Sequence, residues 1–509
     1  WFMLTQVETQ IVSTLFWREW FPEIVYDIHQ QGQFGSRKCV PPFFDPSNPN
    51  IDPTVLREVG ALGSQMALNL QVAGFKGIVT NSTYDTWWHG GLRTAPYYHN
   101  AVGILTEAAS VNIATPMQIK REQLRSPTRG LPDPLVAATN YPDPWPGGAW
   151  TMRDIMNMEL VTTRTALEEA ALHHDEYVRN FVNVAERAIE AGKRDAPYAY
   201  IVPAEQHDKP TANSMIDILI QQGVEVHRAK SDFAVDGKKY AAGSYVILLA
   251  QPYRANVKCL FEAQHYPDRR IYPGGPAEQP YDVAGWTLPM QMGVAYAEAG
   301  RRFDTELERI DSAGGNIRFI ESAGSERAVG MAIYVRPDTD NVYSFINDLM
   351  KTSPGLSISR TTQGETVGKI GYPPGTFVIQ FAPSSKPDKR REQARGAADM
   401  AKEKSLRELA VKYRVGYDLY YLVPKNVAEI FAKHNTSLFS NPPPKKSLSG
   451  TEVSTLIQPR LALYRSWMPS MDEGWTRWVL EQFGFDYKNV YDAEVRAGNL
   501  KDRFDVVIL

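Results

Sequence analysis

The sequence predicts a multidomain α/β protein. At 509 residues the chain is too long for one hydrophobic core, so roughly three or four domains are expected. Short β-branched runs alternate with helical patterns along much of the chain, which is typical of sheets covered by helices. Two of these runs, at residues 23–32 and 103–110, each carry a chemically capable polar side chain near the C-terminal end. Strand ends are where an open α/β sheet presents such groups to a ligand.

The two polar side chains are His29 and Glu107. A His at one strand end and a Glu at another can serve as a metal ligand and a general base. Each also has an ordinary structural interpretation. His29 could be a hydrogen-bonded structural residue, and Glu107 could be a buried carboxylate paired with an arginine. The pattern indicates a candidate site but leaves its chemistry open.

Residues 1–125 resemble the C-terminal part of the catalytic domain of the zinc carboxypeptidase (M14) family. The resemblance rests on His29, on Glu107 and on the aromatic, Gly-rich loop of residues 81–94 between them. The segment 37–46 is similar to that of a bacterial subgroup of long, multidomain proteins of this type. The resemblance implies part of a mixed sheet with helices on both faces, followed by further α/β domains.

The same resemblance implies zinc-dependent hydrolysis of a peptide or a related amide. His29 would be a ligand of Zn²⁺, and Glu107 would be the general base that activates the metal-bound water. Tyr84 matches best the family's tyrosine that closes over the bound peptide, and Tyr97 and Tyr98 are nearby alternatives. The family also implies a secreted or periplasmic protein.

The loop contains two further candidates for contact with the substrate, Arg93 and His89. A folded loop with an ordinary surface cation accounts for them equally well. The same aromatic loop supports a second hypothesis, in which a catalytically degenerate peptidase-like protein binds a peptide or a glycan at the cell surface. The aromatic content of 11% permits this, because aromatic rings hold sugars and peptides alike.

The chain departs from the family before His29. The family's His-x-x-Glu motif and its substrate-binding Arg and Asn-Arg pair lie upstream, whereas the residues before His29 contain no histidine. We therefore interpret the sequence as a fragment that starts after the Asn-Arg pair and stops on a predicted strand at 504–509. Such a fragment is expected to bind zinc weakly and to show no peptidase activity alone. The upstream reading frame would separate the enzymatic hypothesis from the degenerate one.

A second His-x-x-Glu pattern runs from His173 to Glu176. Side chains three residues apart share a helical face. However, this pattern follows Glu107, which is the wrong order for the family, and it lies in a long charged helix. We interpret it as a solvated helix face, where polar residues are ordinarily found.

The amino-acid composition indicates which kinds of partner the protein is expected to bind. A net charge of −3 with 22% charged residues provides no electrostatic case for nucleic-acid binding. The sequence contains no run of about 18 apolar residues that would predict a membrane span. Its two cysteines, Cys39 and Cys259, are far apart and indicate neither a metal cluster nor a disulfide framework. The expected partner is a peptide substrate, and the oligomeric state is open.

Residues 126–192 are predicted to form a Pro-rich loop and a long helix. The helix begins after an N-cap at Thr151 with an acid at Asp154, and Gly192 is placed to cap its end. A break is expected near His173. Residues 193–305 are predicted to form an α/β domain with one β-α-β unit and a hairpin at Asp236-Gly237, a dipeptide that favours the type I′ turn.

Two more domains are predicted towards the C-terminus. Residues 306–440 form an α/β domain in which strands surround a helix at 342–351 and a charged helical segment covers 386–404. Residues 441–446 read as a linker. Residues 450–509 resemble the opening of a class I glutamine amidotransferase, a fold of the flavodoxin type. That activity needs a nucleophilic cysteine, and none follows Cys259, so a binding or structural role is expected.

Overall fold

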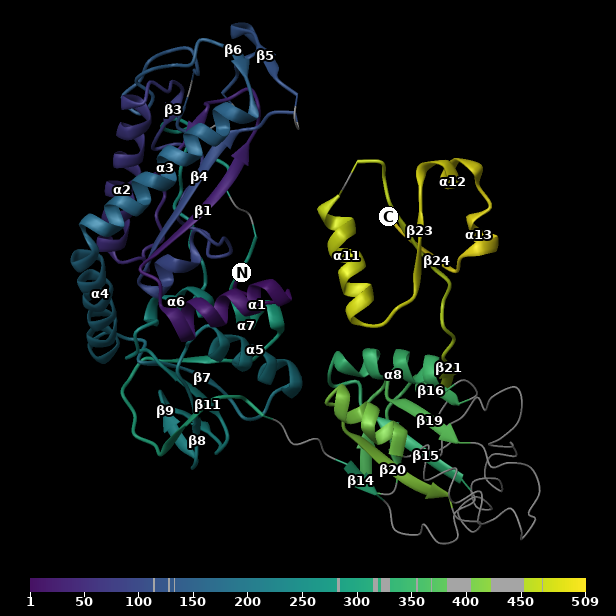
Figure 1. Cartoon of the computed structure of the whole chain (residues 1–509). Coiled ribbons are helices and arrows are strands. Elements are labelled where there is room, and N and C mark those ends of the chain that lie inside the picture. Colours follow the sequence, from purple (N-terminus) through teal and green to yellow (C-terminus); the bar gives the residue numbers. More distant parts are fainter. Residues whose placement is uncertain are drawn as a thin grey trace. The chain divides into compact units, whose positions relative to one another are not determined.

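In the computed structural model the chain divides into two compact units (Figure 1). Unit 1 comprises Trp1–Gln206 and Ala212–Ala313, and unit 2 comprises His207–Thr211 and Gly314–Leu509. Both units mix helices and sheets, so the multidomain α/β prediction is confirmed at this level. The structure describes residues 1–112, 115–126, 129–131, 133–281, 284–314, 319–321, 330–353, 356–367, 369–381, 404–422, 453–468 and 470–509.

The first sheet of unit 1 carries the predicted site. Its strand order is β1-β4-β2-β3. β1 is parallel to β4, β2 is antiparallel to β4, and β3 is parallel to β2, so the sheet is mixed as expected. The strands are β1 (Ile24–Gln31), β2 (Lys38–Cys39), β3 (Ile78–Val79) and β4 (Val102–Ala109).

The two faces of this sheet are covered differently. On one face lie α2 (Pro53–Val72) and α3 (Met152–Leu172), which pack their apolar sides against strand residues such as Ile104 (Figure 1). On the other face Leu105 packs with Tyr84, Leu131 and Tyr141, which belong to loops. The described contacts of Leu105 on this face are with loop residues, and helices on both faces stay a prediction. The loops can cover the second face because they supply large aromatic side chains.

The predicted long helix is present in two parts. Thr151 caps α3 and forms the expected reciprocal pair with Asp154, and the break falls at His173, before α4 (His174–Arg194). Gly192 does not end the helix, which continues past it. A Cβ atom at Gly192 would lie 2.0 Å from the carbonyl oxygen of Leu249. This glycine therefore allows close packing of α4 and is not the predicted cap.

The pattern from His173 to Glu176 lies at this break. The imidazole Nδ1 of His173 is 3.4 Å from Oε2 of Glu176, and both side chains are largely exposed. The interpretation as a solvated helix face is therefore confirmed.

The second sheet of unit 1 is antiparallel throughout, with the order β12-β7-β11-β8-β13. The predicted β-α-β unit is present as β7, α5 and β8, with β11 inserted between the two strands. The last strand, β13, lies beyond the predicted boundary at 305 and still pairs with β8. The elements are β7 (Ala199–Val202), α5 (Lys209–Gln221), β8 (Val226–Ala229), β11 (Tyr245–Leu248), α6 (Arg254–Phe261), β12 (Ala297–Ala299) and β13 (Leu307–Ile310).

The predicted hairpin in this region is confirmed. β9 (Phe233–Val235) pairs with β10 (Lys238–Tyr240), and the turn residues Asp236 and Gly237 have φ values of 51° and 76°. Positive φ at both positions is what a type I′ turn requires. The remaining elements of unit 1 are α1 (Val7–Thr14), the π-helix Leu15–Trp20, β5 (Met117–Ile119), β6 (Gly148–Trp150), α7 (Leu288–Met292) and the 3₁₀ turns Ala95–His99 and Arg121–Gln123.

Unit 2 contains a larger sheet and a smaller one. The larger has the order β14-β20-β15-β19-β16-β21, and its core includes residues of α8 (Asn341–Thr352), close to the predicted helix. Its strands are β14 (Phe319–Glu321), β15 (Gly330–Val335), β16 (Ser357–Thr361), β19 (Phe377–Phe381), β20 (Tyr417–Leu422) and β21 (Val453–Thr455), beside the hairpin β17 (Glu365–Val367) and β18 (Ile370–Tyr372). Nearly all of the predicted charged segment 386–404 and the whole linker 441–446 fall outside the described residues.

The smaller sheet of unit 2 is parallel, with the order β23-β22-β24. Its elements are β22 (Leu461–Tyr464), α11 (Met471–Gln482), β23 (Tyr487–Val490), α12 (Asp492–Ala497), α13 (Leu500–Arg503) and β24 (Val506–Ile508). The strand predicted at 504–509 is present as β24.

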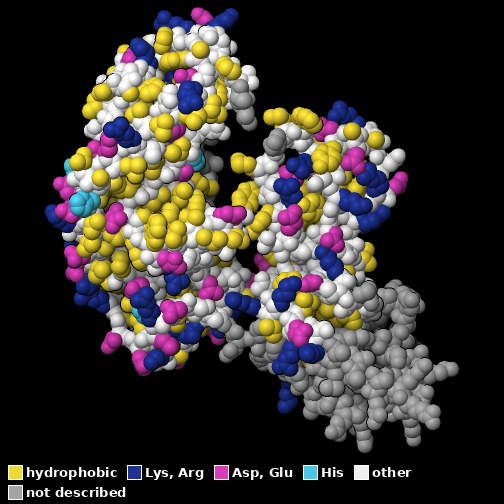
Figure 2. Space-filling model, in the orientation of Figure 1, with side chains coloured by type: hydrophobic (Ala, Val, Ile, Leu, Met, Phe, Trp, Pro, Cys, Tyr) yellow, Lys and Arg dark blue, Asp and Glu magenta, His cyan; other side chains and the backbone are white. Residues whose placement is uncertain are grey.

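The surface of the molecule is mixed in character. On the face shown in Figure 2, basic and acidic side chains are interspersed and hydrophobic side chains occur among them. Exposed apolar residues include Met156, Leu160 and Leu167 of α3. Among the described helices, none has the length and apolar character needed to cross a membrane.

Candidate functional site

The first sheet brings His29 and Glu107 together. In the parallel pair of β1 and β4, His29 stands directly opposite Glu107, so both side chains lie on the same face of the sheet. Nδ1 of His29 is 3.8 Å from Oε1 of Glu107, and Nε2 is 3.2 Å from Oδ2 of Asp27. The imidazole is half exposed (51%), whereas the carboxylate of Glu107 is nearly buried (8%). The two residues that the sequence singled out thus form one polar pair, open to solvent on the histidine side.

The carboxylate of Glu107 is buried, and its two oxygens differ in their contacts. The hydroxyl of Tyr84 donates a hydrogen bond to Oε1, while Oε2 has no hydrogen-bond partner among the described residues. Burial raises the pKa of Glu107 above its ordinary value, and the hydrogen bond from Tyr84 and the charge of His29 oppose part of that rise. A buried carboxylate with a raised pKa is suited to accept and return a proton near neutral pH.

Tyr84 lies over Glu107 and is itself enclosed. Its ring makes edge contacts with Phe43 and Tyr281, at centroid distances of 5.8 and 5.0 Å. Burial and the neighbouring carboxylate of Glu107 raise the pKa of Tyr84, so the phenol stays protonated and acts as a donor. The hydroxyl of Tyr84 thus lies on the carboxylate of Glu107, and its role in covering a substrate stays a prediction.

Arg93 packs against the ring of Tyr84. Its guanidinium carbon lies 4.9 Å from the centroid of the Tyr84 ring, and Nη1 donates to the carbonyl oxygen of Asp85 at 2.9 Å. The loop backbone meets β4 at Gly103, where a Cβ atom would lie 1.8 Å from the carbonyl oxygen of Arg93. Only glycine allows this approach. Arg93 is buried, and its contact with a substrate stays a prediction.

His89 lies apart from this group. It is buried, Nε2 lies 2.7 Å from Oδ1 of Asn256, and the ring stacks on Tyr98 at 4.3 Å. Burial lowers the pKa of His89 to about 3. These contacts are those of an interior residue, and they do not favour the expected role in substrate binding. We leave His89 out of the proposed site.

The buried His89 predicts acid sensitivity. Its pKa is about 3 in the folded protein and 6.5 in the unfolded chain, so the unfolded chain takes up the proton first. The stability that His89 contributes is therefore complete above pH 6.5 and is lost as the pH falls towards 3. At pH 4.5 we expect the wild type to have lost about 3 kcal/mol more than a His89→Gln variant, each relative to its own value at pH 7.5. Urea unfolding at both pH values measures this, and an equal fall in the two proteins would contradict it.

The structure adds residues that the sequence analysis missed. Lys38 is fully buried on β2, and its ammonium forms an ion pair with Glu159 of α3. Cys39 stands opposite Glu107 on the neighbouring strand, and burial raises the pKa of its thiol to about 12. The burial of Lys38 has no local signal in the sequence, because a lysine is ordinarily expected at the surface. Only the packing of α3 against the sheet reveals the buried pair.

A metal centre needs several ligating side chains close together. No group of three or more His, Cys, Asp or Glu side chains suited to hold a metal ion occurs within the residues that the structure describes. A catalytic zinc ion takes three protein ligands and keeps one position for water. His29 supplies one imidazole, so the described residues do not by themselves fit a catalytic zinc ion.

Comparison of this chain with models of known protein families, with curated proteins and with solved structures finds no match. The resemblance of residues 1–125 to the zinc carboxypeptidases therefore stays a prediction, based on His29, Glu107 and the loop between them.

Proposed function

We propose that Glu107 is the general base of a hydrolytic site that cleaves a peptide or a related amide bond, as in the zinc carboxypeptidases. One observation carries the proposal. A buried carboxylate with one free oxygen stands in register with His29 and beneath the hydroxyl of Tyr84. Burial raises the pKa of Glu107, and a general base is most effective when its pKa lies near the pH at which it works.

In this proposal Glu107 removes a proton from the attacking water and passes it to the leaving amine. The hydrogen bond from Tyr84 orients the carboxylate through Oε1 and leaves Oε2 for the water. The ring of Tyr84 covers the substrate side of the site, and Arg93 behind it supplies positive charge over the ring. The substrate class is a peptide with a free C-terminus, by analogy with the family.

His29 is proposed as one ligand of Zn²⁺. The carboxylate of Asp27 lies beside its Nε2 and can hold the ring in one orientation, as acceptors near metal-binding histidines commonly do. Because the described residues supply only one imidazole at this point, no chemical step is assigned to the metal. The steps above concern Glu107 and Tyr84 alone.

Zinc titration of the 509-residue chain tests whether His29 and its neighbours in this chain can hold the metal by themselves. We expect no tight, stoichiometric binding, because a single imidazole cannot hold Zn²⁺ tightly. Calorimetry is carried out on the wild type, on His29→Ala and on His173→Ala, whose histidine is similarly exposed. Tight binding that disappears only in His29→Ala would contradict the expectation and show that further ligands lie in this chain.

The hydrolytic proposal is tested by peptide cleavage. The protein, supplied with zinc, is incubated with peptides that have a free or an amidated C-terminus. Cleavage of the free form, lost in Glu107→Gln, supports the proposal. Cleavage that persists in Glu107→Gln would remove Glu107 as the base.

A second candidate function is binding without hydrolysis. It is favoured by the way in which Glu107 is covered. The hydroxyl of Tyr84 donates a hydrogen bond to Oε1 of Glu107, and Tyr281 packs against the ring of Tyr84. Aromatic side chains bind peptides and glycans in proteins that carry out no chemistry. The same assay separates the two functions, since a binding protein would retain an intact peptide equally well in the wild type and in Glu107→Gln.

A further inference from the structure

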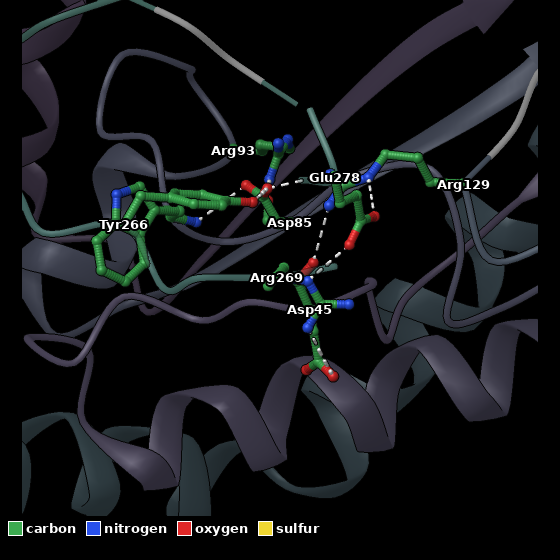
Figure 3. Close-up of polar contacts among 8 residues, drawn as sticks. Asp45, Asp85, Arg93, Arg129, Tyr266, Arg269 and Glu278 are labelled. Carbon is green, nitrogen blue, oxygen red and sulfur yellow. Dashed lines mark hydrogen bonds and ion pairs between the residues drawn. The ribbon is translucent and has the colours of Figure 1, made fainter. Parts of the chain in front are cut away.

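A segment far along the chain lies against the loop that carries Tyr84. Residues 263–281, which we call the strap, follow α6 and are irregular. Figure 3 shows side chains of the strap, among them Tyr266 and Glu278, converging with Asp85 of the loop and with Arg129. The strap and the loop both belong to unit 1.

Asp85 is the centre of the contacts on the loop side. Its side chain is almost fully buried (1%) and accepts from three donors. Nη1 of Arg129 lies 3.1 Å from Oδ2, and the hydroxyl of Tyr266 lies 3.2 Å from the same oxygen. The backbone N–H of Trp87 donates to Oδ1 at 3.2 Å. A buried carboxylate of this kind is stable only while it is paired.

Arg129 extends the contacts to the strap. Its Nε lies 3.0 Å from Oε1 of Glu278, whose other oxygen lies 2.8 Å from Nε of Arg269. Glu278 is thus held between two arginines, as Figure 3 shows. Arg129 is the residue that joins the buried carboxylate of the loop to the carboxylate of the strap.

These contacts surround Tyr84, the residue that precedes Asp85 in the chain. The carbonyl oxygen of Asp85 accepts from Arg93, and Arg93 lies over the ring of Tyr84. From the strap, Tyr281 packs its ring edgewise against Tyr84. The position of Tyr84 over Glu107 therefore depends on where Asp85 and the strap are held.

We infer that Arg129 and Glu278 are positioning residues, which hold Tyr84 over Glu107 by tying the loop to the strap. The inference rests on the proposed function to the extent that Glu107 is the reacting carboxylate. The placement of Tyr84 itself can be measured without any substrate. Without Arg129 the buried carboxylate of Asp85 keeps only the hydroxyl of Tyr266 and the N–H of Trp87 as donors, so the effect is expected first at the loop that carries Tyr84.

The test is the rate at which tetranitromethane nitrates Tyr84, followed by peptide mass spectrometry. In Arg129→Gln and in Glu278→Gln we expect the rate at Tyr84 to rise about fivefold, the factor that corresponds to roughly 1 kcal/mol. Arg129→Lys should restore part of the protection, because it keeps the charge but not the planar fork. Arg164→Gln, which removes an exposed ion pair with Glu168, is the matched control and should leave the rate unchanged.

Tyr97 and Tyr98 are fully buried and report on general loosening. A selective rise at Tyr84 supports the inference. An unchanged rate at Tyr84 in both variants, or a rise shared with Tyr97 and Tyr98, would overturn it. Peptide cleavage is measured on the same proteins. Absence of cleavage in every protein would count against the proposed function, while the nitration result would still decide whether Arg129 and Glu278 position Tyr84.

Discussion

Replacement of Glu107 by glutamine is expected to lower kcat/KM for peptide hydrolysis by about 10²–10⁴-fold, the usual contribution of a general base. Glutamine preserves the shape of the side chain and can still accept from the hydroxyl of Tyr84. It cannot take a proton from water. We therefore expect the loss mainly in kcat, with little change in KM, because ground-state contacts with the peptide persist.

The control for this experiment is Glu122→Gln, which makes the same chemical change at an exposed position of unit 1. It should leave kcat and KM at their wild-type values. Equal activity of wild type and Glu107→Gln would contradict the role of Glu107. A large rise in KM with unchanged kcat would instead assign Glu107 to substrate binding.

The largest effect on stability is expected at Lys38. Its side chain is fully buried, and its ion pair with Glu159 lies between β2 and α3. Burial lowers the pKa of Lys38, which shows that desolvation of the ammonium is costly. Lys38→Met would leave the carboxylate of Glu159 without its cation in a mostly buried place. We expect a loss of about 3 kcal/mol, the lower end of the range for a broken buried pair, because Glu159 keeps some contact with solvent.

The double variant Lys38→Met/Glu159→Met should recover most of this loss. Two apolar side chains of similar volume carry no desolvation cost, so replacing a whole buried pair is often neutral or stabilising. The free energy of unfolding from urea titration of the wild type, both single variants and the double variant gives the coupling energy. Lys193→Met, which breaks an exposed pair with Glu190, should change stability by less than about 0.5 kcal/mol. A double variant as unstable as Lys38→Met would contradict the account.

Local features of the fold were predictable from the sequence. The type I′ turn at Asp236-Gly237, the N-cap at Thr151 and the break at His173 all occur where they were expected. Each depends on residues within one or two turns of the chain, and their conformational preferences persist in any surroundings. Gly192 shows the limit of such patterns. The same residue that can end a helix can also lie inside one, where another segment approaches closely.

Part of the candidate site could also be predicted from the sequence, and part could not. His29 and Glu107 could be identified because each ends a β-branched run, and two such strand ends meet when the strands are parallel neighbours. Whether His89 faced the site or the interior could not be decided, since a histidine in a loop is compatible with both. Its hydrogen bond to Asn256, far along the chain, places it in the interior.

The sequence by itself determined the class of the fold, the positions of many of its helices and strands, and the pair of polar residues at the ends of two strands. Only the tertiary structure decided that Lys38 is buried, and that Asp85, Arg129 and Glu278 form one network around Tyr84. The physical reason is the range of the interactions. Turns and caps are settled between neighbours in the chain, whereas burial and the pairing of charges depend on segments that meet only when the chain folds.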